Sequence, residues 1–514
     1  MSRKYDLIVI GAGNGGLMTA CRSARMGLKV LVLERHNLPG GAATSFVRGR
    51  FEFEAALHEL PDCGTGNEHI GQLRAILDEM GVKLDTLPIQ HPFRYLVKTE
   101  DGKVMADITF THGREAVMDF FRKECPEDVE NVEKVFMAAE DILRGIAYVG
   151  STRGKLDPKV LERDHPNYMR LMSMTVGEFF KEIGMGQKCQ DILSVYWAYQ
   201  GSDIYTLDAS RYLIMLLGFL SYGAYVPRYR SHMLSVSLVE RARELGAEFR
   251  FGTEVTKVLT DHGAICAVEA GGEVFSCTAI ASSAFPEVVY SKLLDNKSLV
   301  PKFEPQKANA RDYGFRGFCV YLGLDATPEE LGIKDYTVFI TNTFDTVKMF
   351  KGCSDKDNEL SLLDAVCLNI ANPQCSPEGT CILVLTISYT SDTWADVTED
   401  KYYVEKERIA EKMIDTYERK MGIHIREHIE EIEIASPVTF AHYMYTPQGS
   451  IYGYQSTPWD GMSSRSIAGG GEPTIPGLFF VGGHSTQCSG FMPTYLGGNQ
   501  TAFQILGYVM GGGH

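Results

Sequence analysis

The sequence predicts an α/β fold in which a doubly wound, Rossmann-like domain is joined to a mixed α+β domain. Residues 5–10 and 29–34 have the apolar character of buried strands, and residues 15–27 between them have the pattern of a helix. A glycine-rich stretch, GAGNGG from Gly11 to Gly16, lies at the turn from the first strand to this helix. The chain has 514 residues, more than one hydrophobic core usually supports, so we expect at least two domains.

The glycine-rich stretch fits the dinucleotide-binding pattern G-x-G-x-x-G in the strand-to-helix context that the pattern requires. Gly11 permits the tight turn, Gly13 lets a pyrophosphate approach the backbone, and Gly16 lets the helix pack closely on the strand. Glu34 ends the second strand, where its carboxylate can accept the hydroxyls of an adenosine ribose and disfavours the extra phosphate of NADP. The opening unit is therefore predicted to bind a dinucleotide.

Small residues at both ends of the chain favour FAD over NAD. Pro39-Gly40-Gly41 follows Glu34 closely, where a second backbone approach to a longer cofactor needs small residues. Near the other end, residues 475–485 and 496–506 read as a strand, a glycine turn and a helix that begins at about Asn499. The FAD-binding domain is therefore expected to be discontinuous.

The pattern along the chain predicts how the domains alternate. We expect FAD-binding segments at residues 1–90, 230–300 and 441–514, a helical cap at 91–229 and a substrate-domain sheet at 301–440. Further strands are predicted at 248–251, 266–274, 317–324 and 381–387, and a charged helix at 404–420.

Composition narrows the partners and the location. The formal net charge of −16 disfavours binding to nucleic acid. The twelve cysteines form no C-x-x-C pair, and no export signal opens the chain, so we expect a cytoplasmic protein with reduced thiols. The longest apolar run, residues 212–226, is shorter than the roughly 20 residues of a membrane span. It predicts a buried helix, and a lipophilic substrate tunnel or a peripheral membrane contact are the alternatives.

Four segments carry a resemblance: VIGAGNGGLMTACRSARMGLKVLVLERHNLPGG from Val9, EFRFGTEVTKVL from Glu248, GSIYGY from Gly449 and PGLFFVGGHSTQCSGFMPTYLGGNQTA from Pro476. Together they resemble the phytoene desaturase group of flavoproteins, which includes carotenoid isomerases and retinol saturases. FEFEAALHEL, from Phe51, is similar to the F-x-F-D-x-G-x-H stretch of the retinol saturase branch. The resemblance implies an FAD domain, a lipophilic substrate in a tunnel that leads to the flavin, and chemistry at carbon–carbon bonds.

The sequence departs from the pattern of the group in three places. Ala42 stands where many relatives have arginine or another polar residue, Arg230-Ser231-His232 precedes Met233 where Gly-Gly is usual, and Glu54-Ala55 replaces Asp-Gly. These departures leave desaturation, saturation and isomerisation as open alternatives.

Candidate site residues follow from these patterns. His484, His58 and Tyr452 are the candidates for a catalytic role near the flavin. Val255 is expected, from the resemblance, to contact the adenine through its backbone. The full set of expected cofactor contacts is Gly11, Gly13, Gly16, Glu34, Arg35, Gly40, Gly41, Val255, Gly482, Gly483, Gly497, Gly498 and Asn499. His424 to His428 spells H-x-x-E-H, but it follows a charged surface helix and leads into a strand, so no metal site is expected.

The leading prediction is an FAD-dependent oxidoreductase that acts on carbon–carbon bonds of a long unsaturated substrate such as a carotenoid or retinoid. Two alternatives share the architecture: an amine or amino-acid oxidase, and a non-enzymatic prenyl-lipid binding protein. The intact glycine motifs disfavour the binding protein, and no diagnostic feature favours the oxidase.

Overall fold

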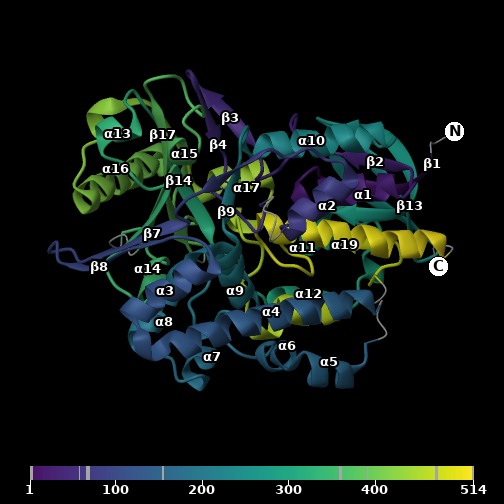
Figure 1. Cartoon of the computed structure of the whole chain (residues 1–514). Coiled ribbons are helices and arrows are strands. Elements are labelled where there is room, and N and C mark those ends of the chain that lie inside the picture. Colours follow the sequence, from purple (N-terminus) through teal and green to yellow (C-terminus); the bar gives the residue numbers. More distant parts are fainter. Residues whose placement is uncertain are drawn as a thin grey trace.

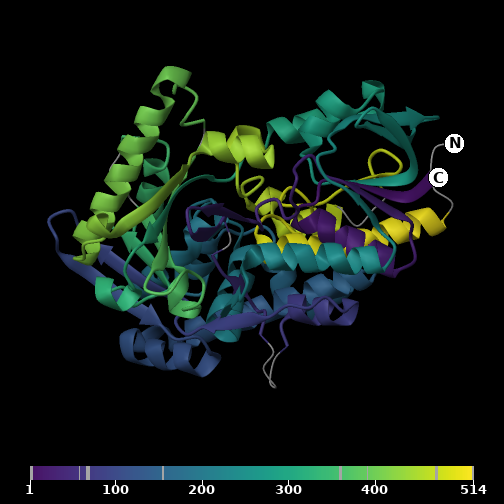
Figure 2. The ribbon, with the colours of Figure 1, turned by 90° about the horizontal axis from the view of Figure 1, so that it is seen from above.

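Two large sheets organise the chain (Figure 1). The computed structural model describes residues 4–56, 58–64, 70–152, 156–357, 362–390, 392–468 and 473–511. Figure 2 shows from above that the second sheet lies on one side with the long helix α16 (Tyr402–Met421), while the lobe containing both chain ends lies on the other.

The first sheet is the predicted Rossmann-like sheet, and it joins three separate parts of the chain. Its parallel strands are β10 (Glu248–Arg250), β2 (Val30–Leu33), β1 (Lys4–Ile10), β13 (Glu273–Ser282) and β19 (Leu478–Phe480). Two antiparallel strands, β12 (Ala264–Ala270) and β11 (Val255–Asp261), extend it beyond β13. Because the apolar residues of β1 and β2 are buried and the two strands flank helix α1 (Asn14–Arg25) in the chain, the predicted β-α-β unit is confirmed.

One predicted strand proves to be two. Residues 266–274 were expected to run as a single strand, but β12 ends at Ala270 and β13 begins at Glu273. Gly271 and Gly272 between them both have positive φ angles, of 56° and 78°, so the chain reverses direction in a tight hairpin.

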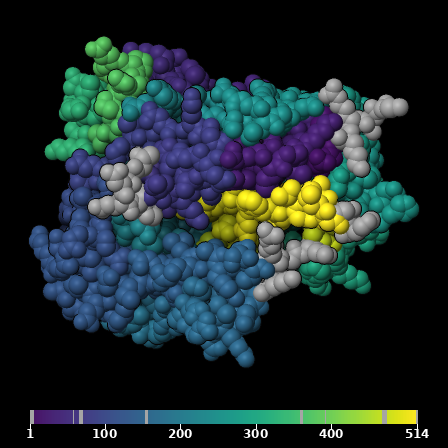
Figure 3. Space-filling model, turned by 45° about the vertical axis from the view of Figure 1, so that its right-hand side comes forward, coloured from purple at the N-terminus to yellow at the C-terminus, as the bar shows by residue number. Residues whose placement is uncertain are grey.

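The last helix begins earlier than the sequence predicted. Helix α19 runs from Phe491 to Met510, so a start at about Asn499 was wrong, and Gly497 and Gly498 lie inside the helix. The helix tolerates these glycines because it packs very closely on α1: a Cβ atom on Gly498 would lie 2.4 Å from the carbonyl oxygen of Gly15. Figure 3 shows the purple N-terminal segment and the yellow C-terminal segment side by side on one face.

The second sheet has seven strands in the order β18, β14, β17, β16, β15, β7 and β8. Their bounds are β18 (Ile429–Ala435), β14 (Arg316–Leu324), β17 (Cys381–Tyr389), β16 (Leu362–Cys367), β15 (Thr337–Thr341), β7 (Phe93–Lys98) and β8 (Val104–Phe110). The strands predicted at 317–324 and 381–387 and the helix at 404–420 are confirmed as β14, β17 and α16. Strands β7 and β8 correct the expectation of a helical cap over all of 91–229, because β7 pairs with β15 from the second half of the chain.

The cap is helical from residue 114 onward. It contains α3 (Arg114–Glu124), α4 (Val129–Ser151), α5 (Pro158–Asp164), α6 (Pro166–Leu171), α7 (Val176–Glu182), α8 (Gln187–Leu193) and α9 (Ala209–Leu216). The apolar run 212–226 begins in α9, continues as a π-helix over Leu217–Tyr222 and ends in β9 (Ala224–Pro227), largely buried throughout. Among the described residues, no helix combines the length and apolar character needed to cross a membrane.

Shorter elements connect these parts. They are β3 (Ser45–Arg48), β4 (Phe51–Glu54), β5 (Leu60–Pro61), β6 (Thr86–Ile89), α2 (Gln72–Met80), α10 (Arg230–Glu244), α11 (Pro286–Val288), α12 (Phe303–Asn309), α13 (Pro328–Leu331), α14 (Thr346–Gly352), α15 (Leu368–Ala371), α17 (Pro437–Met444) and α18 (Met462–Ala468).

Candidate functional site

A cavity of about 450 Å³ extends from the glycine-rich turn of the first sheet to the inner face of the second. At one end it is lined by Gly11, Gly13, Glu34 and Gly40, and at the other by residues of β14, β15, β16, β17 and α9. A continuous space of this size, with walls from both domains, has the character of a ligand site.

The glycine-rich turn has the geometry that a pyrophosphate requires. Gly11 has a φ of 93°, which permits the sharp turn out of β1. Gly13 caps helix α1, and a Cβ atom placed on it would meet nothing within 4 Å, so its backbone faces open space in the cavity. Gly16 faces away from the cavity, where a Cβ atom would lie 2.2 Å from the Gly11 carbonyl oxygen. Together with the positive end of the α1 dipole, these three positions fit a bound dinucleotide.

Glu34 lies at the end of β2 and lines the same part of the cavity. Its Oε2 accepts a 2.6 Å hydrogen bond from the backbone N–H of Ala12, and its Oε1 accepts one of 2.8 Å from the N–H of His36. A carboxylate has about four acceptor positions, so these two bonds orient the group and leave capacity for ribose hydroxyls. Arg35 and Val255 also line the cavity, and their contact with a cofactor stays a prediction.

The glycine pair Gly482-Gly483 lines the cavity, whereas the pair Gly497-Gly498 does not. Gly482, with a φ of 106°, and Gly483 belong to the cavity lining, and Gly40 and Gly41 lie opposite them in the loop after β2. Gly497 and Gly498 instead serve the packing of α19. Asn499 Oδ1 accepts a 2.7 Å hydrogen bond from Nε of Arg22 on α1. Gly497, Gly498 and Asn499 do not belong to the cavity lining, and a cofactor contact through them stays a prediction.

His484 is a buried, neutral imidazole on the cavity wall. Burial, reinforced by the positive charges of Arg465 and Arg311, lowers the pKa of His484 to about 3. Its ring packs against Phe285 with a centroid distance of 4.7 Å, and its Nε2 has no hydrogen-bond partner among the described residues. A neutral imidazole offers a hydrogen bond to a bound molecule, and the low pKa is a poor match to general-acid catalysis as an imidazolium near neutral pH.

His58 lies at the other end of the cavity, beside two buried carboxyl groups. Its Nδ1 is 3.0 Å from Oδ2 of Asp364 on β16, and its backbone carbonyl accepts a 2.6 Å hydrogen bond from the Tyr336 hydroxyl. The adjacent Glu59 accepts a 3.2 Å hydrogen bond from the Tyr199 hydroxyl. Burial and the charge of Asp364 raise the pKa of Glu59 well above its usual range. The sequence analysis named His58 as a catalytic candidate but did not single out Glu59 or Asp364.

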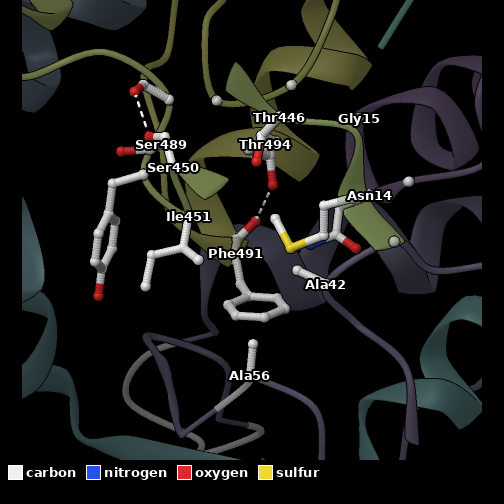
Figure 4. Close-up of a pocket in the computed structure, with 18 of the residues that line it drawn as sticks. Asn14, Gly15, Ala42, Ala56, Thr446, Ser450, Ile451, Ser489, Phe491 and Thr494 are labelled. Atoms are coloured by element: carbon white, nitrogen blue, oxygen red, sulfur yellow. Dashed lines mark hydrogen bonds between the residues drawn. The ribbon is translucent and has the colours of Figure 1, made fainter. Parts of the chain in front are cut away.

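The second sheet presents one row of side chains to the cavity. Cys319, Thr386, Asp364 and Phe339 are paired across β14, β17, β16 and β15, and all four line the cavity. Tyr452 lies on the same wall, and burial raises the pKa of its phenol above the usual value, so the group stays protonated. Figure 4 shows the neighbouring part of the lining, where the ring of Phe491 points toward Ala56.

Arg211 on α9 is another residue that the sequence did not single out. It is buried at the cavity wall, and its Nη2 donates to the carbonyl and hydroxyl oxygens of Ser489 at 2.7 and 3.0 Å. Its Nε and Nη1 have no partner among the described residues. An arginine next to an otherwise apolar helix run, and an aspartate inside the apolar strand LLDAVC, are the signals that could have identified Arg211 and Asp364.

Comparisons with known proteins agree with this geometry. A family described as NAD(P)-binding Rossmann-like domain matches residues 9–79. All-trans-retinol 13,14-reductase of Danio rerio is 22% identical over 483 residues, which cover 87% of this chain and 77% of that protein. The 4,4'-diapolycopene oxygenase of Methylomonas sp is 26% identical over 95% of both chains. Prolycopene isomerase of Daucus carota is 23% identical over 98% of this chain and 80% of that protein.

These relatives support the resemblance of the chain to the phytoene desaturase group. Solved structures share the fold of the group: an oxidoreductase from Methanosarcina mazei has a TM-score of 0.65 at 15% identity, covering 98% of this chain and all of that one. Putrescine oxidase has a TM-score of 0.62 at 13% identity, covering 99% of this chain and all of that one. The chain therefore shares the fold of these oxidoreductases.

Proposed function

We propose that this phytoene desaturase-like protein is an FAD-dependent oxidoreductase acting on carbon–carbon bonds of a long, lipophilic unsaturated substrate such as a carotenoid or retinoid. The observation that carries the proposal is the single cavity that joins the dinucleotide cradle to a chamber of apolar side chains. Ile214, Phe219, Phe339 and Leu362 belong to that chamber. The names of the relatives, which include a retinol reductase, a prolycopene isomerase and a diapophytoene desaturase, support the same substrate class.

One set of residues would bind the cofactor, and another would orient the substrate. Gly11, Gly13 and Glu34 would hold the pyrophosphate and the adenosine ribose. Bound FAD would supply hydride exchange with a carbon atom. The row on the second sheet and the apolar side chains of α9 would exclude water and align an elongated substrate, which such a reaction needs more than it needs a dedicated acid.

The glycine positions support FAD rather than a shorter dinucleotide. Gly482 and Gly483 line the cavity far along the chain from Gly13, so two separate glycine turns face the same space. We further propose a division into FAD-binding segments 1–90, 230–300 and 441–514, a helical cap within 91–229, and a substrate sheet at 301–440 that β7 and β8 extend. We also propose a cytoplasmic location that allows peripheral membrane contact.

The test is the absorption spectrum of the purified protein, followed by identification of the cofactor released on denaturation. A yellow protein that releases FAD in a one-to-one ratio is the expected result. A folded protein that stays colourless after FAD is added would contradict the proposal and favour a lipid-binding protein. Extraction of lipids that co-purify with the protein identifies the substrate class.

A further inference from the structure

Two buried carboxyl groups line the apolar end of the cavity, and each has an oxygen atom without a partner in the part of the chain that the structure describes. Glu59 and Asp364 are each only 6% exposed. Glu59 uses Oε1 to accept the hydrogen bond from Tyr199, while Oε2 has no partner among the described residues. Asp364 uses Oδ2 in its contact with His58, while Oδ1 has no partner there either. Both residues belong to the cavity lining.

Unpaired polar atoms at such a position are costly. A buried hydrogen-bonding atom without a partner destabilises a protein by about 1 to 3 kcal/mol, so native structures rarely keep two together. Phe219, Phe339 and Leu362 on the surrounding walls offer only carbon atoms. The hydroxyl of Thr386, which is paired with Asp364 across β16 and β17, donates instead to the sulfur of Cys319. Water or a polar group of a ligand in the cavity can supply the missing hydrogen bonds, and a ligand that displaces the water must replace them.

The two carboxyl groups differ in what they offer. Burial and the nearby charge of Asp364 keep the proton on Glu59, whose pKa is raised well above its usual range. A protonated carboxyl donates a hydrogen bond. Asp364, which contacts His58, offers its free Oδ1 as an acceptor. The pair therefore presents one donor and one acceptor.

Among a hydroxyl, a carbonyl and an ammonium group, only the hydroxyl matches both. A hydroxyl accepts and donates at the same time. A carbonyl oxygen accepts only, and would leave Asp364 Oδ1 unpaired. An ammonium group donates only, and would require Glu59 to lose its proton in a site where burial opposes the charge.

We propose that Glu59 and Asp364 bind a hydroxyl group at one end of the substrate, so that the substrate is a long unsaturated alcohol rather than a plain hydrocarbon. This inference rests on the proposed function, since it assumes that a lipophilic molecule occupies the cavity. The two carboxyl groups would bind the polar end of the substrate, while apolar side chains such as Phe219, Phe339 and Leu362 contact its hydrocarbon chain.

Three ligands that differ only at one end test the inference. Affinities of oleyl alcohol, octadecene and oleylamine are measured by equilibrium dialysis at fixed detergent concentration, with the cofactor-loaded protein. The expected result is that the alcohol binds about tenfold tighter than octadecene, as two net hydrogen bonds of about 0.7 kcal/mol each imply. The amine is expected to bind more weakly than the alcohol.

Two variants locate the effect. Glu59→Leu should remove most of the preference for the alcohol while leaving octadecene bound, and Glu59→Gln, which still donates through its amide, should retain most of it. Ile214→Ala is the matched control on the apolar wall, and it should weaken both ligands by the same factor. The three-ligand comparison on the unmodified protein needs no variant to fold.

The outcomes separate this inference from the proposed function. Equal affinity for oleyl alcohol and octadecene overturns the hydroxyl site but leaves a lipophilic substrate intact. Tighter binding of oleylamine than of the alcohol also overturns it, and indicates a cation site. Binding of none of the three by the cofactor-loaded protein overturns the proposed function itself.

Discussion

The carboxylate of Glu54 and the backbone of Ser231 are hydrogen-bonded although they lie 177 residues apart, with a distance of 2.9 Å from the Ser231 nitrogen to Oε2. The Ser231 hydroxyl donates to the other carboxylate oxygen. Both residues lie where the sequence departs from the pattern of the phytoene desaturase group, which has aspartate at the first position and Gly-Gly at the second. Arg230 keeps the left-handed conformation expected of a glycine, with a φ of 70°, and its Nη2 donates to the Glu52 carbonyl at 2.9 Å. The two departures from the pattern are thus in direct contact.

Glu54 should make folding stability depend on pH. Burial raises its pKa to about 7 from the ordinary 4.5, so the folded state holds the proton more tightly than the unfolded state. The stabilisation is complete below pH 4.5 and is lost as the pH rises to 7, by about 3 kcal/mol. Asp208, whose pKa burial raises to about 6, acts in the same direction.

Urea denaturation at a series of pH values measures this effect. Glu54→Gln cannot titrate but can still accept from the Ser231 N–H, so its stability should fall less steeply over the same range. An identical slope in Glu54→Gln and the unmodified protein would show that Glu54 is not the titrating group.

The fold could be predicted where the sequence signal is local. The β-α-β unit around Gly11 and Gly16 carries both strand periodicity and turn chemistry, so its three elements and the discontinuous domain were predicted. The start of α19 was not, because Gly498 looks like a turn residue in sequence, and only contact with Gly15 explains a glycine inside a helix. Asp364 was missed for a similar reason. Its role depends on His58 and Glu59, which are distant in sequence.

Gly498→Ala should destabilise the protein by about 1 to 3 kcal/mol, because the new methyl group would overlap the Gly15 carbonyl at the α1–α19 contact. Gly507→Ala is the matched control in the same helix, since its Cβ would meet nothing within 4 Å. It should be neutral or stabilise the protein by about 0.5 to 1 kcal/mol through helix propensity. Thermal unfolding of both variants measures the difference, and equal effects would refute the close-packing account.

Gly13→Val should abolish retention of the dinucleotide. The added side chain would project into the open space beside the turn, where the pyrophosphate must meet the backbone. The amount of FAD that stays bound to the purified Gly13→Val protein measures this retention. Gly150→Val is the control, because its Cβ also meets nothing within 4 Å but lies in α4, outside the cavity lining. A folded Gly13→Val protein with a full complement of FAD would refute the assignment.

Glu34→Ala should weaken FAD binding by about 1.5 to 3 kcal/mol, the typical contribution of hydrogen bonds to a charged group. Equilibrium titration of the cofactor-free protein with FAD, followed by flavin fluorescence, gives the change. Glu254→Ala removes an equal charge from the same cavity wall and should have a smaller effect. Equal losses in the two variants would mean that the ribose is held elsewhere.

The most direct test of the account is turnover by the cofactor-loaded protein on a homologous series of polyenes and, in parallel, on a panel of amines. Flavin spectra and product formation are followed for each compound. We predict conversion of the polyenes, with affinity falling about fourfold for each methylene removed, because burial of one CH₂ contributes about 0.8 kcal/mol. Turnover confined to the amines, with the polyenes neither bound nor converted, would contradict the account.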